Sequence, residues 1–217
     1  MNILDYSKLL AQGMQVTLAA WFCAALISLI LGTLFAIASC RALTSSKTYA
    51  LIKLYTFIAK GIPAYVQILI AYFLIPALCG ISLPAFAAAC GALAFCSSGY
   101  VTEIIRAGIN AVPKGQWQAA AVLGYSLPAQ LKRIILPQAF RAIAPALFGE
   151  AEQLLKSTSL LATIGIAELT RTGMNIISRE LNPVAVYATL AIIYLLFAAM
   201  LNSVLIVLEK RMRYGQR

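Results

Sequence analysis

A small set of polar and charged side chains interrupts the long apolar stretches of this sequence, and these residues are its candidates for chemistry. Isolated polar groups are unfavourable at membrane depth, so they tend either to line a path or to hold helices together by hydrogen bonds. Hydrolytic and zinc chemistry is not indicated, because the sequence has no His, no HExxH and no GxSxG. The candidates are Gln67, Ser97, Ser98, Tyr100, Glu150, Lys156, Ser157, Thr158 and Ser159.

Two further chemistries can be set aside from the sequence. The five cysteines lie scattered in apolar stretches without CxxC or similar ligand spacing, which favours packing as small apolar side chains over metal binding or redox activity. The sequence also has no GxxxxGK[ST] phosphate loop. Any energy from a nucleotide must therefore come from a partner protein.

The composition places the chain in a membrane. Of its 217 residues, 62% are hydrophobic and 11% are charged, whereas a soluble domain has roughly 45–50% apolar and about 25% charged residues. A formal net charge of +10 could suggest a nucleic-acid partner. The basic residues cluster in loops between apolar runs, however, and that distribution is typical of membrane topology.

The apolar runs predict five membrane spans in one all-α polytopic domain, residues 1–217. A bilayer core requires about 20 apolar residues in a helix. Runs at 9–40, 54–78, 84–106 and 184–208 meet this requirement, and a fourth, less apolar span begins near Ala139.

The basic residues also predict the orientation. Twelve Lys and Arg lie in the turn 41–53, the segment 103–145 and the C-terminal tail, against four in the N-terminus, the turn 79–83 and the connector 156–180. Cytoplasmic loops are the ones enriched in Lys and Arg. We therefore expect the N-terminus outside and the C-terminus in the cytoplasm.

The sequence between the third and fourth predicted spans predicts a cytoplasmic helical hairpin. Pro113 suits a helix start, 114–123 holds good helix formers, and Gly124 is a natural left-handed stop. Ser126 can cap a second short helix with its side chain, and Pro137 predicts a break or kink where the chain re-enters the membrane.

The surface of this hairpin has two interpretations. Gln118-Ala119-Ala120 presents very little side chain, so another protein could approach closely, with Trp117 as an aromatic anchor beside it. The spacing is equally compatible with an amphipathic hairpin that lies on the membrane surface.

The same segment resembles the cytoplasmic EAA loop of ABC-importer permeases, whose pattern is E-A-A-x3-G-x9-I-x-L-P. Only the first residue departs, because Gln118 stands where the family has Glu. The residues at the fixed positions of this pattern are Gln118, Ala119, Ala120, Gly124, Ile134, Leu136 and Pro137.

Other motifs resemble the polar amino acid uptake permeases of the histidine/glutamine/arginine type. They are Gly61-Ile62-Pro63 followed by Val66-Gln67, Arg106-Ala107-Gly108-Ile109, Pro113-Lys114-Gly115-Gln116-Trp117, and Lys156-Ser157-Thr158-Ser159-Leu160. The resemblance extends from about residue 15 to 210.

This resemblance implies the permease subunit of an ATP-driven importer in the bacterial inner membrane, and not an enzyme. It implies polar amino acids as substrates (basic amino acids or glutamine), an extracytoplasmic amino-acid-binding protein, and a second permease copy or paralogue. ATP and Mg²⁺ would bind to separate ATPase subunits. The coupling loop would span about 107–140, with Trp117, Gln118, Ala119, Ala120 and Gly124 at the ATPase contact. Ile134, Leu136 and Pro137 would fix the return of the chain into the membrane.

If the substrate is a polar amino acid, the polar and charged candidate residues can be assigned binding roles. A zwitterionic amino acid needs an acid for its ammonium group and a cation or N–H groups for its carboxylate. Glu150 and Lys156 form one such complementary pair, six residues apart on different helix faces. Both residues could instead brace helices.

The remaining candidates stay open in the same way. Gln67 lies after the Gly61/Pro63 break, and Ser97 and Tyr100 lie where relatives often read Asn-Ser-x-x-Tyr. Cys96 replaces that Asn, which puts an amide contact there in doubt. Ser157 stands where many relatives have an acid, and this weakens a preference for a cationic substrate.

Two other residues have simpler interpretations, and one rival class remains. Lys60 is expected to extend to the cytoplasmic interface as an anchor, and Glu103 and Arg106 to form a structural pair on one helix face. The rival is an ion-gradient-driven secondary amino acid transporter. Such proteins often contain inverted repeats, and we find no repeat in this sequence.

Overall fold

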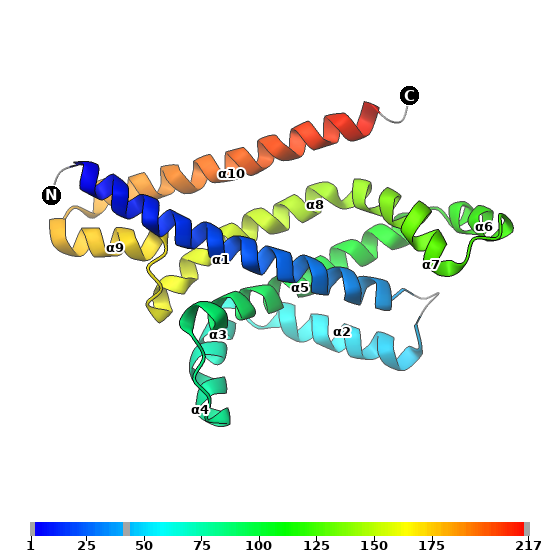
Figure 1. Ribbon diagram of the computed structural model, residues 1–217, viewed down its shortest axis with the longest axis horizontal. Helices are drawn as coiled ribbons and strands as arrows, with labels where there is room; N and C mark the ends of the chain where they lie inside the picture. Colours follow the sequence, from blue (N-terminus) through cyan, green and yellow to red (C-terminus); the bar gives the residue numbers. More distant parts are fainter. Residues whose placement is uncertain (1–2, 41–43, 215–217) are drawn as a thin grey trace.

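The computed structural model describes residues 3–40 and 44–214, with side chains described for 6–40 and 44–210, and the described residues form helices and no strand (Figure 1). Arg41 and the arginines of the C-terminal tail, which entered the orientation count, lie outside the described side chains. The elements in order are α1 Ile3–Ala38, α2 Ser46–Gly61, α3 Ala64–Leu69, the π-helical segment η1 Ile70–Leu74, α4 Ile75–Cys79, α5 Ala85–Ala111, α6 Lys114–Val122, α7 Leu127–Gln130, the π-helical segment η2 Leu131–Ile135, α8 Leu136–Ser157, the 3₁₀ segment η3 Thr158–Ile164, α9 Leu169–Glu180 and α10 Pro183–Tyr214.

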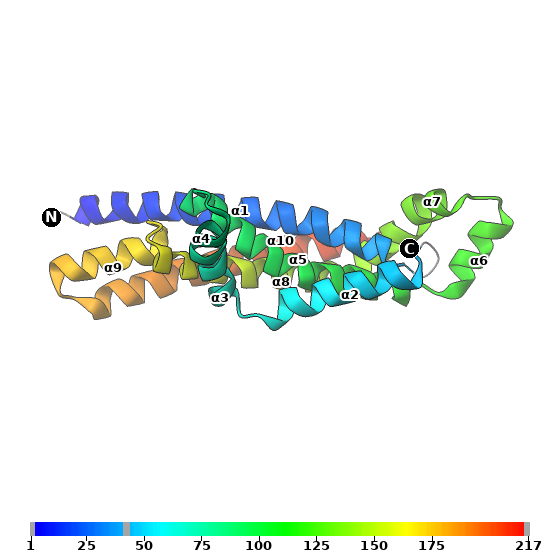
Figure 2. The same cartoon turned by 90° about the horizontal axis from the view of Figure 1, so that it is seen from below.

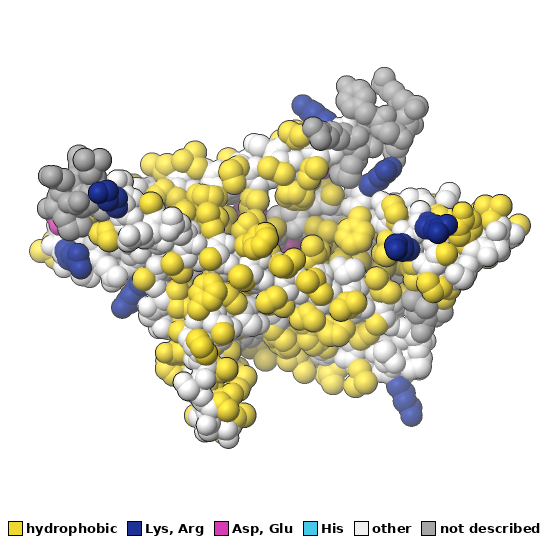
Figure 3. Space-filling model, in the orientation of Figure 1, with side chains coloured by type: hydrophobic (Ala, Val, Ile, Leu, Met, Phe, Trp, Pro, Cys, Tyr) yellow, Lys and Arg dark blue, Asp and Glu magenta, His cyan; other side chains and the backbone are white. Residues whose placement is uncertain are grey.

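The long helices run side by side in an elongated bundle (Figures 1 and 2). Three of them are long and apolar enough to cross a membrane: Tyr6–Ala38, Ala85–Ala111 and Pro183–Lys210. The start of α1 lies at one end of the bundle with α9, and the end of α10 lies toward the other, where α6 and α7 are found. On the face shown in Figure 3, hydrophobic side chains cover the middle, whereas Lys and Arg lie toward the two ends.

The second predicted span differs from the structure, because it is a broken helix pair and not one straight helix. Ser46–Gly61 and Ala64–Cys79 meet at an angle of 99°, and they make a fourth span only if the bent pair counts as one. The break falls at Pro63, which has no N–H to donate to the carbonyl of Ala59. The side-chain amide of Gln67 replaces that donor: its Nε2 donates to Ala59 O at 2.8 Å and to Ile62 O at 2.7 Å.

Two π-helical segments each precede a proline by two residues. The first ends at Leu74 before Pro76, and the second ends at Ile135 before Pro137. A proline ring clashes with the carbonyl four residues earlier, and a locally wider turn relieves that clash. Of the break or kink predicted at Pro137, the break does not occur, because η2 runs on into α8, which has Pro137 in its first turn.

The helix at the place of the predicted fourth span is α8. It packs against α5, α10 and α1, but it is not among the three helices apolar enough to be recognised as spans. Glu150, Glu152 and Lys156 lie in its second half. The described helices thus give three or four apolar spans, and the five-span arrangement stays a prediction.

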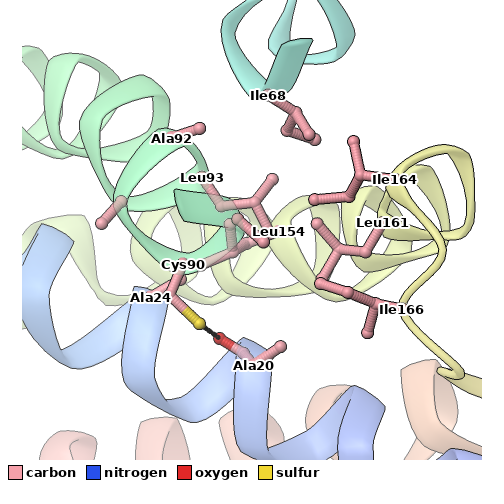
Figure 4. Packing of buried hydrophobic residues seen from close by; sticks show 12 residues of the cluster. Ala20, Ala24, Ile68, Cys90, Ala92, Leu93, Leu154, Leu161, Ile164 and Ile166 are labelled. Carbon is pink, nitrogen blue, oxygen red and sulfur yellow. Dashed lines mark hydrogen bonds between the residues drawn. The ribbon is translucent and has the colours of Figure 1, made fainter. Parts of the chain in front are cut away.

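Two apolar clusters hold the bundle together. The first joins α1, α3, α5, α8 and η3, and it includes Ala20, Ile68, Leu93, Leu154 and Leu161 (Figure 4). Small residues let α1 and α5 approach, and the thiol of Cys90 lies 3.9 Å from the carbonyl oxygen of Ala20. This cluster fixes α3 against α5 and α8 next to the bend.

The second cluster lies at the opposite half of the bundle, where α5, η2 and α8 meet the end of α1. It includes Ala36, Ile105, Leu131, Ile135 and Ala139. Because it contains residues on both sides of α6 and α7, it attaches that hairpin firmly to the helices.

A fully buried carboxylate anchors α9 at the far end of the bundle. Glu168 lies in the connector before α9, and its oxygens accept hydrogen bonds from the N–H groups of Thr170 (2.8 Å) and Arg171 (2.7 Å). Burial raises the pKa of Glu168, and these hydrogen bonds act in the opposite direction. Thr17 accepts from Leu169 N–H at 3.0 Å, so α9 is fastened to α1 as well.

Candidate functional site: a helical hairpin and a polar cavity

The hairpin of α6 and α7 forms as predicted in most respects. Pro113 precedes α6, and Gly124 has φ +77°, the left-handed conformation that ends the helix. The predicted side-chain cap by Ser126 is wrong, because Ser126 caps α7 with its backbone only. Instead, Gln130, which is buried, donates from Nε2 to Tyr125 O at 2.8 Å and holds the turn closed.

Figure 1 shows the hairpin standing out from one end of the bundle. Gln118 and Ala119 are exposed, as a docking surface requires. Ala120 is only 1% exposed, and Trp117 is partly buried against the second cluster, so both face their own chain. Trp117 is therefore placed to support the hairpin, in contrast to the protruding anchor that we expected.

Sequence reasoning missed two apolar side chains on this surface. Val122 is 88% exposed and Leu123 is 73% exposed, directly before Gly124. Their signal was present in the sequence, since two branched apolar residues precede a helix-ending glycine. Together with Gln118 and Ala119 they form a surface that we call the hairpin tip.

The base of the hairpin packs against the bundle. Ile134 and Leu136 pack against the second cluster, while Pro137 is exposed at the start of α8. The amide of Gln138 joins the two arms, donating to Ile134 O at 2.9 Å and to Gln116 Oε1 at 3.3 Å. Ile134, Leu136 and Pro137 thus lie where the chain returns to the bundle, and their role in fixing that return stays a prediction.

A cavity of about 360 Å³ lies where α5 and α8 meet the bend between α2 and α3. We call it the Glu150 cavity. Its volume is within the roughly 300–1,000 Å³ of most small-molecule sites. The residues that line it are Lys60, Ile62, Pro63, Ala64, Leu93, Cys96, Ser97, Tyr100, Glu150, Gln153, Leu154 and Ser157.

The polar groups of the Glu150 cavity come from three helices. Ser97 Oγ on α5 donates to Glu150 Oε1 on α8 at 2.7 Å. Lys60 at the end of α2 places its Nζ 5.8 Å from the centre of the Tyr100 ring, on the cation-attracting face of that ring. One carboxylate and one ammonium group thus share a cavity, and this is the charge complement of a zwitterion.

The structure divides the predicted path residues into two groups. Ser97, Tyr100, Glu150 and Ser157 line the Glu150 cavity. Lys156 does not line it, and its Nζ lies 2.6 Å from Glu152 Oε1 on an exposed part of α8. The charged residue that lines this cavity together with Glu150 is therefore Lys60, and Lys156 lies outside it.

The other predicted path residues also lie outside this cavity. Gln67 is buried, and its amide is engaged by the backbone at the bend. Thr158 is fully buried and donates to Leu155 O, while Ser159 is partly buried and donates to Lys156 O. Their geometry matches packing and local capping of the end of α8.

No group of three or more His, Cys, Asp or Glu side chains that could hold a metal ion occurs among the described residues. The ion pair of Glu103 and Arg106 on α5 forms as predicted.

Comparisons with known proteins place this chain in a transporter family. Residues 28–214 match the family described as binding-protein-dependent transport system inner membrane component. The arginine transport system permease protein ArtQ of Bacillus subtilis (strain 168) is 37% identical over 174 residues, covering 77% of this chain and 78% of ArtQ. The putative glutamine transport system permease protein GlnP of Rickettsia felis is 32% identical over 209 residues, covering 95% of each.

Solved structures show the same architecture. A crystal structure of an amino acid ABC transporter with histidines is similar to this chain, with a TM-score of 0.86 and 34% identity. The match covers 97% of this chain and 100% of the chain in that structure. The MetNI methionine ABC transporter in an inward-facing conformation matches with a TM-score of 0.84 at 16% identity, which shows a shared fold alone. Because the family model matches most of the length of this chain, the chain belongs to the inner membrane components of binding-protein-dependent transport systems.

Proposed function

We propose that this chain is the permease subunit of an ATP-driven ABC importer that carries a polar amino acid into the bacterial cytoplasm. Relatives at 30–40% identity are named as arginine, glutamine and L-cystine transport permeases. These names support amino acids as the substrate class. Basic amino acids or glutamine are the substrates that we expect first.

One observation carries the proposal: a short helix with small outward side chains stands clear of the bundle and is attached rigidly to it. Gln118 and Ala119 are exposed, while the second cluster holds the base of the hairpin. A protein that binds the tip can therefore push or pull α5 and α8 as a unit. That is the arrangement needed to pass movement from a separate ATPase to the membrane helices.

The proposed cycle follows from this geometry. ATP and Mg²⁺ bind to two partner ATPase subunits, whose closure draws two hairpins together and opens the path outward. An extracytoplasmic binding protein then delivers its amino acid toward Glu150. Hydrolysis resets the path so that it opens to the cytoplasm.

We propose five spans for the folded chain in the bacterial inner membrane, with α8 as the fourth. The N-terminus then lies outside, and the hairpin and C-terminus lie in the cytoplasm. The positions of α9 and of the hairpin at opposite ends of the bundle support this orientation. Because these few spans do not enclose a path, a second permease copy or a paralogue completes it.

The Glu150 cavity supports recognition of the backbone of an amino acid. The carboxylate of Glu150 suits an ammonium or guanidinium group, and Lys60 suits a carboxylate. The hydrogen bond from Ser97 holds the carboxylate of Glu150 toward α5. A site of this kind accepts both basic amino acids and glutamine, provided that the side chain fits.

The test begins with purification in mild detergent and identification of whatever accompanies the chain. We expect an ATPase that contains a GxxxxGK[ST] loop, and its loss in the Leu123→Asp variant. Reconstituted with its partners and binding protein, the complex should take up labelled arginine, histidine or glutamine only with ATP inside the vesicles. Uptake that survives without ATP but collapses with a protonophore would favour the gradient-driven transporter instead.

A further inference from the structure

A second cavity, which we call the Lys53 cavity, lies beside the Glu150 cavity. It has a volume of about 390 Å³ and opens between α2, α5 and the end of α1. The described residues that line it are Ser39, Tyr49, Ile52, Lys53, Thr56, Phe57, Lys60, Gly61, Glu103 and Arg106.

The Lys53 cavity is charged, with an excess of cations. Lys53, Lys60 and Arg106 face a single carboxylate, that of Glu103, among its described lining residues. Arg106 is already paired with Glu103. Neither Lys53 nor Lys60 makes an ion pair with any described residue, although Lys60 lies within electrostatic range of Glu103. Two ammonium groups thus remain available to an anion that enters from solution.

Lys60 belongs to both cavities. It lines the Glu150 cavity next to Tyr100, and it lines the Lys53 cavity next to Glu103. Lys53 and Lys60 are seven residues apart on α2, two helical turns, so they lie on one face roughly 10 Å apart along the axis. A flexible lysine chain at this position can stay with a carboxylate while that carboxylate moves from one cavity to the other.

The order of the two cavities along the bundle gives a direction. The Glu150 cavity is lined by the end of α2 and by Ser97, whereas the Lys53 cavity is lined by Tyr49 in the first turn of α2 and by Arg106 further along α5. That part of α5 leads directly to the hairpin (Figure 1). The Lys53 cavity therefore lies nearer the end that the hairpin occupies.

We propose that the Lys53 cavity is a second, exit-side binding station for the transported amino acid, and this inference rests on the proposed importer function. The α-carboxylate is held by Lys60 at the first station and by Lys60 together with Lys53 at the second, while its ammonium group exchanges Glu150 for Glu103. Lys60 serves both stations, and Lys53 serves only the second.

The mixture of charges favours an amino acid over the phosphate of an anionic lipid headgroup. An acidic headgroup needs cations only, whereas this cavity also presents Glu103 beside Arg106, both about 30% exposed at their side chains. A carboxylate in the wall repels a phosphate but binds the ammonium group of an amino acid. The walls contributed by Ile52 and Phe57 suit the aliphatic part of either ligand.

The test uses single-cysteine reporters in the assembled complex, in neutral phosphatidylcholine vesicles during ATP turnover. In one variant the native Cys96 reports on the Glu150 cavity. In the other, Ile52→Cys reports on the Lys53 cavity and Cys96 is replaced by Ser; the remaining native cysteines are replaced in both. The rate of labelling by N-ethylmaleimide is measured with and without the amino acid that the complex takes up. Its decarboxylated amine (agmatine, where the substrate is arginine) serves as the probe without a carboxylate.

We expect the amino acid to slow labelling at both cysteines, by roughly tenfold at about ten times its dissociation constant. The amine should give little protection at Ile52→Cys, because Lys53 has no carboxylate to bind. Lys53→Gln should remove the protection at Ile52→Cys but keep it at Cys96, and Lys53→Arg should restore it. Lys47→Gln is the matched control, since Lys47 lies on the same helix and is not among the lining residues of either cavity.

Three results would overturn the inference, and they are distinguishable. Protection at Cys96 alone, with normal uptake, means that the importer has no second station. Slow labelling at Ile52→Cys that requires phosphatidylglycerol and no amino acid assigns the cavity to a lipid headgroup. Absence of both uptake and protection refutes the importer itself, and the second station with it.

Discussion

The hydroxyl of Ser97 donates a hydrogen bond to Oε1 of Glu150 at 2.7 Å and so joins α5 to α8 within the Glu150 cavity. Both helices continue to the hairpin, one before it and one after it. A relative shift of the two helices therefore changes the position of this carboxylate. The contact links the part of the chain that could bind substrate with the part that could bind the ATPase.

The first prediction concerns this contact. Ser97→Ala removes a hydrogen bond to a charged group, which is worth about 1.5–3 kcal/mol, and we expect amino acid affinity at the permease to fall roughly tenfold or more. Binding of labelled amino acid to the purified complex measures it. Ser28→Ala is the control, because the hydroxyl of Ser28 is buried in α1 and bonds only to Ala25 O of its own helix. Equal effects of the two changes would argue for general destabilisation.

The second prediction separates the charge of Glu150 from its packing. Glu150→Gln keeps the size of the side chain and an acceptor for Ser97 but removes the negative charge. We expect uptake of a basic amino acid to fall about tenfold or more, since the charged hydrogen bond to the substrate becomes a neutral one. Glu152→Gln, on the same helix but paired with Lys156, should change uptake less than twofold, because exposed pairs are worth about 0–1 kcal/mol.

The third prediction distinguishes the two lysines. Lys60→Gln removes the ammonium group that shares the cavity with Glu150, and we expect uptake to fall about tenfold. Lys156→Gln should have little effect, because Lys156 is exposed and paired with Glu152. The rates of ATP-driven uptake in vesicles measure both. The reverse order of effects would restore Lys156 to the path and remove Lys60 from it.

The fourth prediction tests the bend between α2 and α3. Gln67→Leu retains the approximate volume but removes the donor to Ala59 O and Ile62 O, and it leaves one buried and one partly buried acceptor without it. We expect a loss of stability of about 1–3 kcal/mol, seen as a lower midpoint of thermal unfolding in detergent. Gln12→Leu, at an exposed position on α1, should leave the midpoint unchanged. An unchanged midpoint for Gln67→Leu would mean that the apolar cluster alone fixes the bend.

The fifth prediction concerns the hairpin tip. Leu123→Asp places a charge at a 73% exposed position, so the fold should tolerate it while the ATPase contact should not. We expect normal insertion and thermal stability with loss of the co-purifying ATPase. Trp117→Ala should instead lower stability, because Trp117 packs against the second cluster. Retention of the ATPase by Leu123→Asp would place the contact elsewhere on the hairpin.

Most of the secondary structure could be predicted from sequence because the controlling interactions are local. Apolar runs longer than a bilayer give α1, α5 and α10, and Pro113 and Gly124 begin and end α6 through their own backbone constraints. The spacing of small residues around Gly124 gave the resemblance that the family match confirms.

The bend and the cavities could not be predicted in this way. A proline at position 63 signals a break, but the 99° angle depends on Gln67 and on the packing of Ile68 against α5 and α8. The exposure of Val122 and Leu123 and the inward packing of Trp117 depend on where the second cluster lies.

The sequence by itself determined that this chain crosses a membrane. It also determined where the basic loops and the hairpin lie along the chain, and which residues could carry a charge inside the membrane. Hydrophobicity and backbone stereochemistry act over a few residues, and a sequence displays them directly. Only the tertiary structure decided that Glu150 shares its cavity with Lys60, 90 residues earlier. Lys156, which is nearer to Glu150 in the sequence, forms an ion pair with Glu152 instead. Helix packing brought these groups together, and it depends on the shape of all the side chains between them.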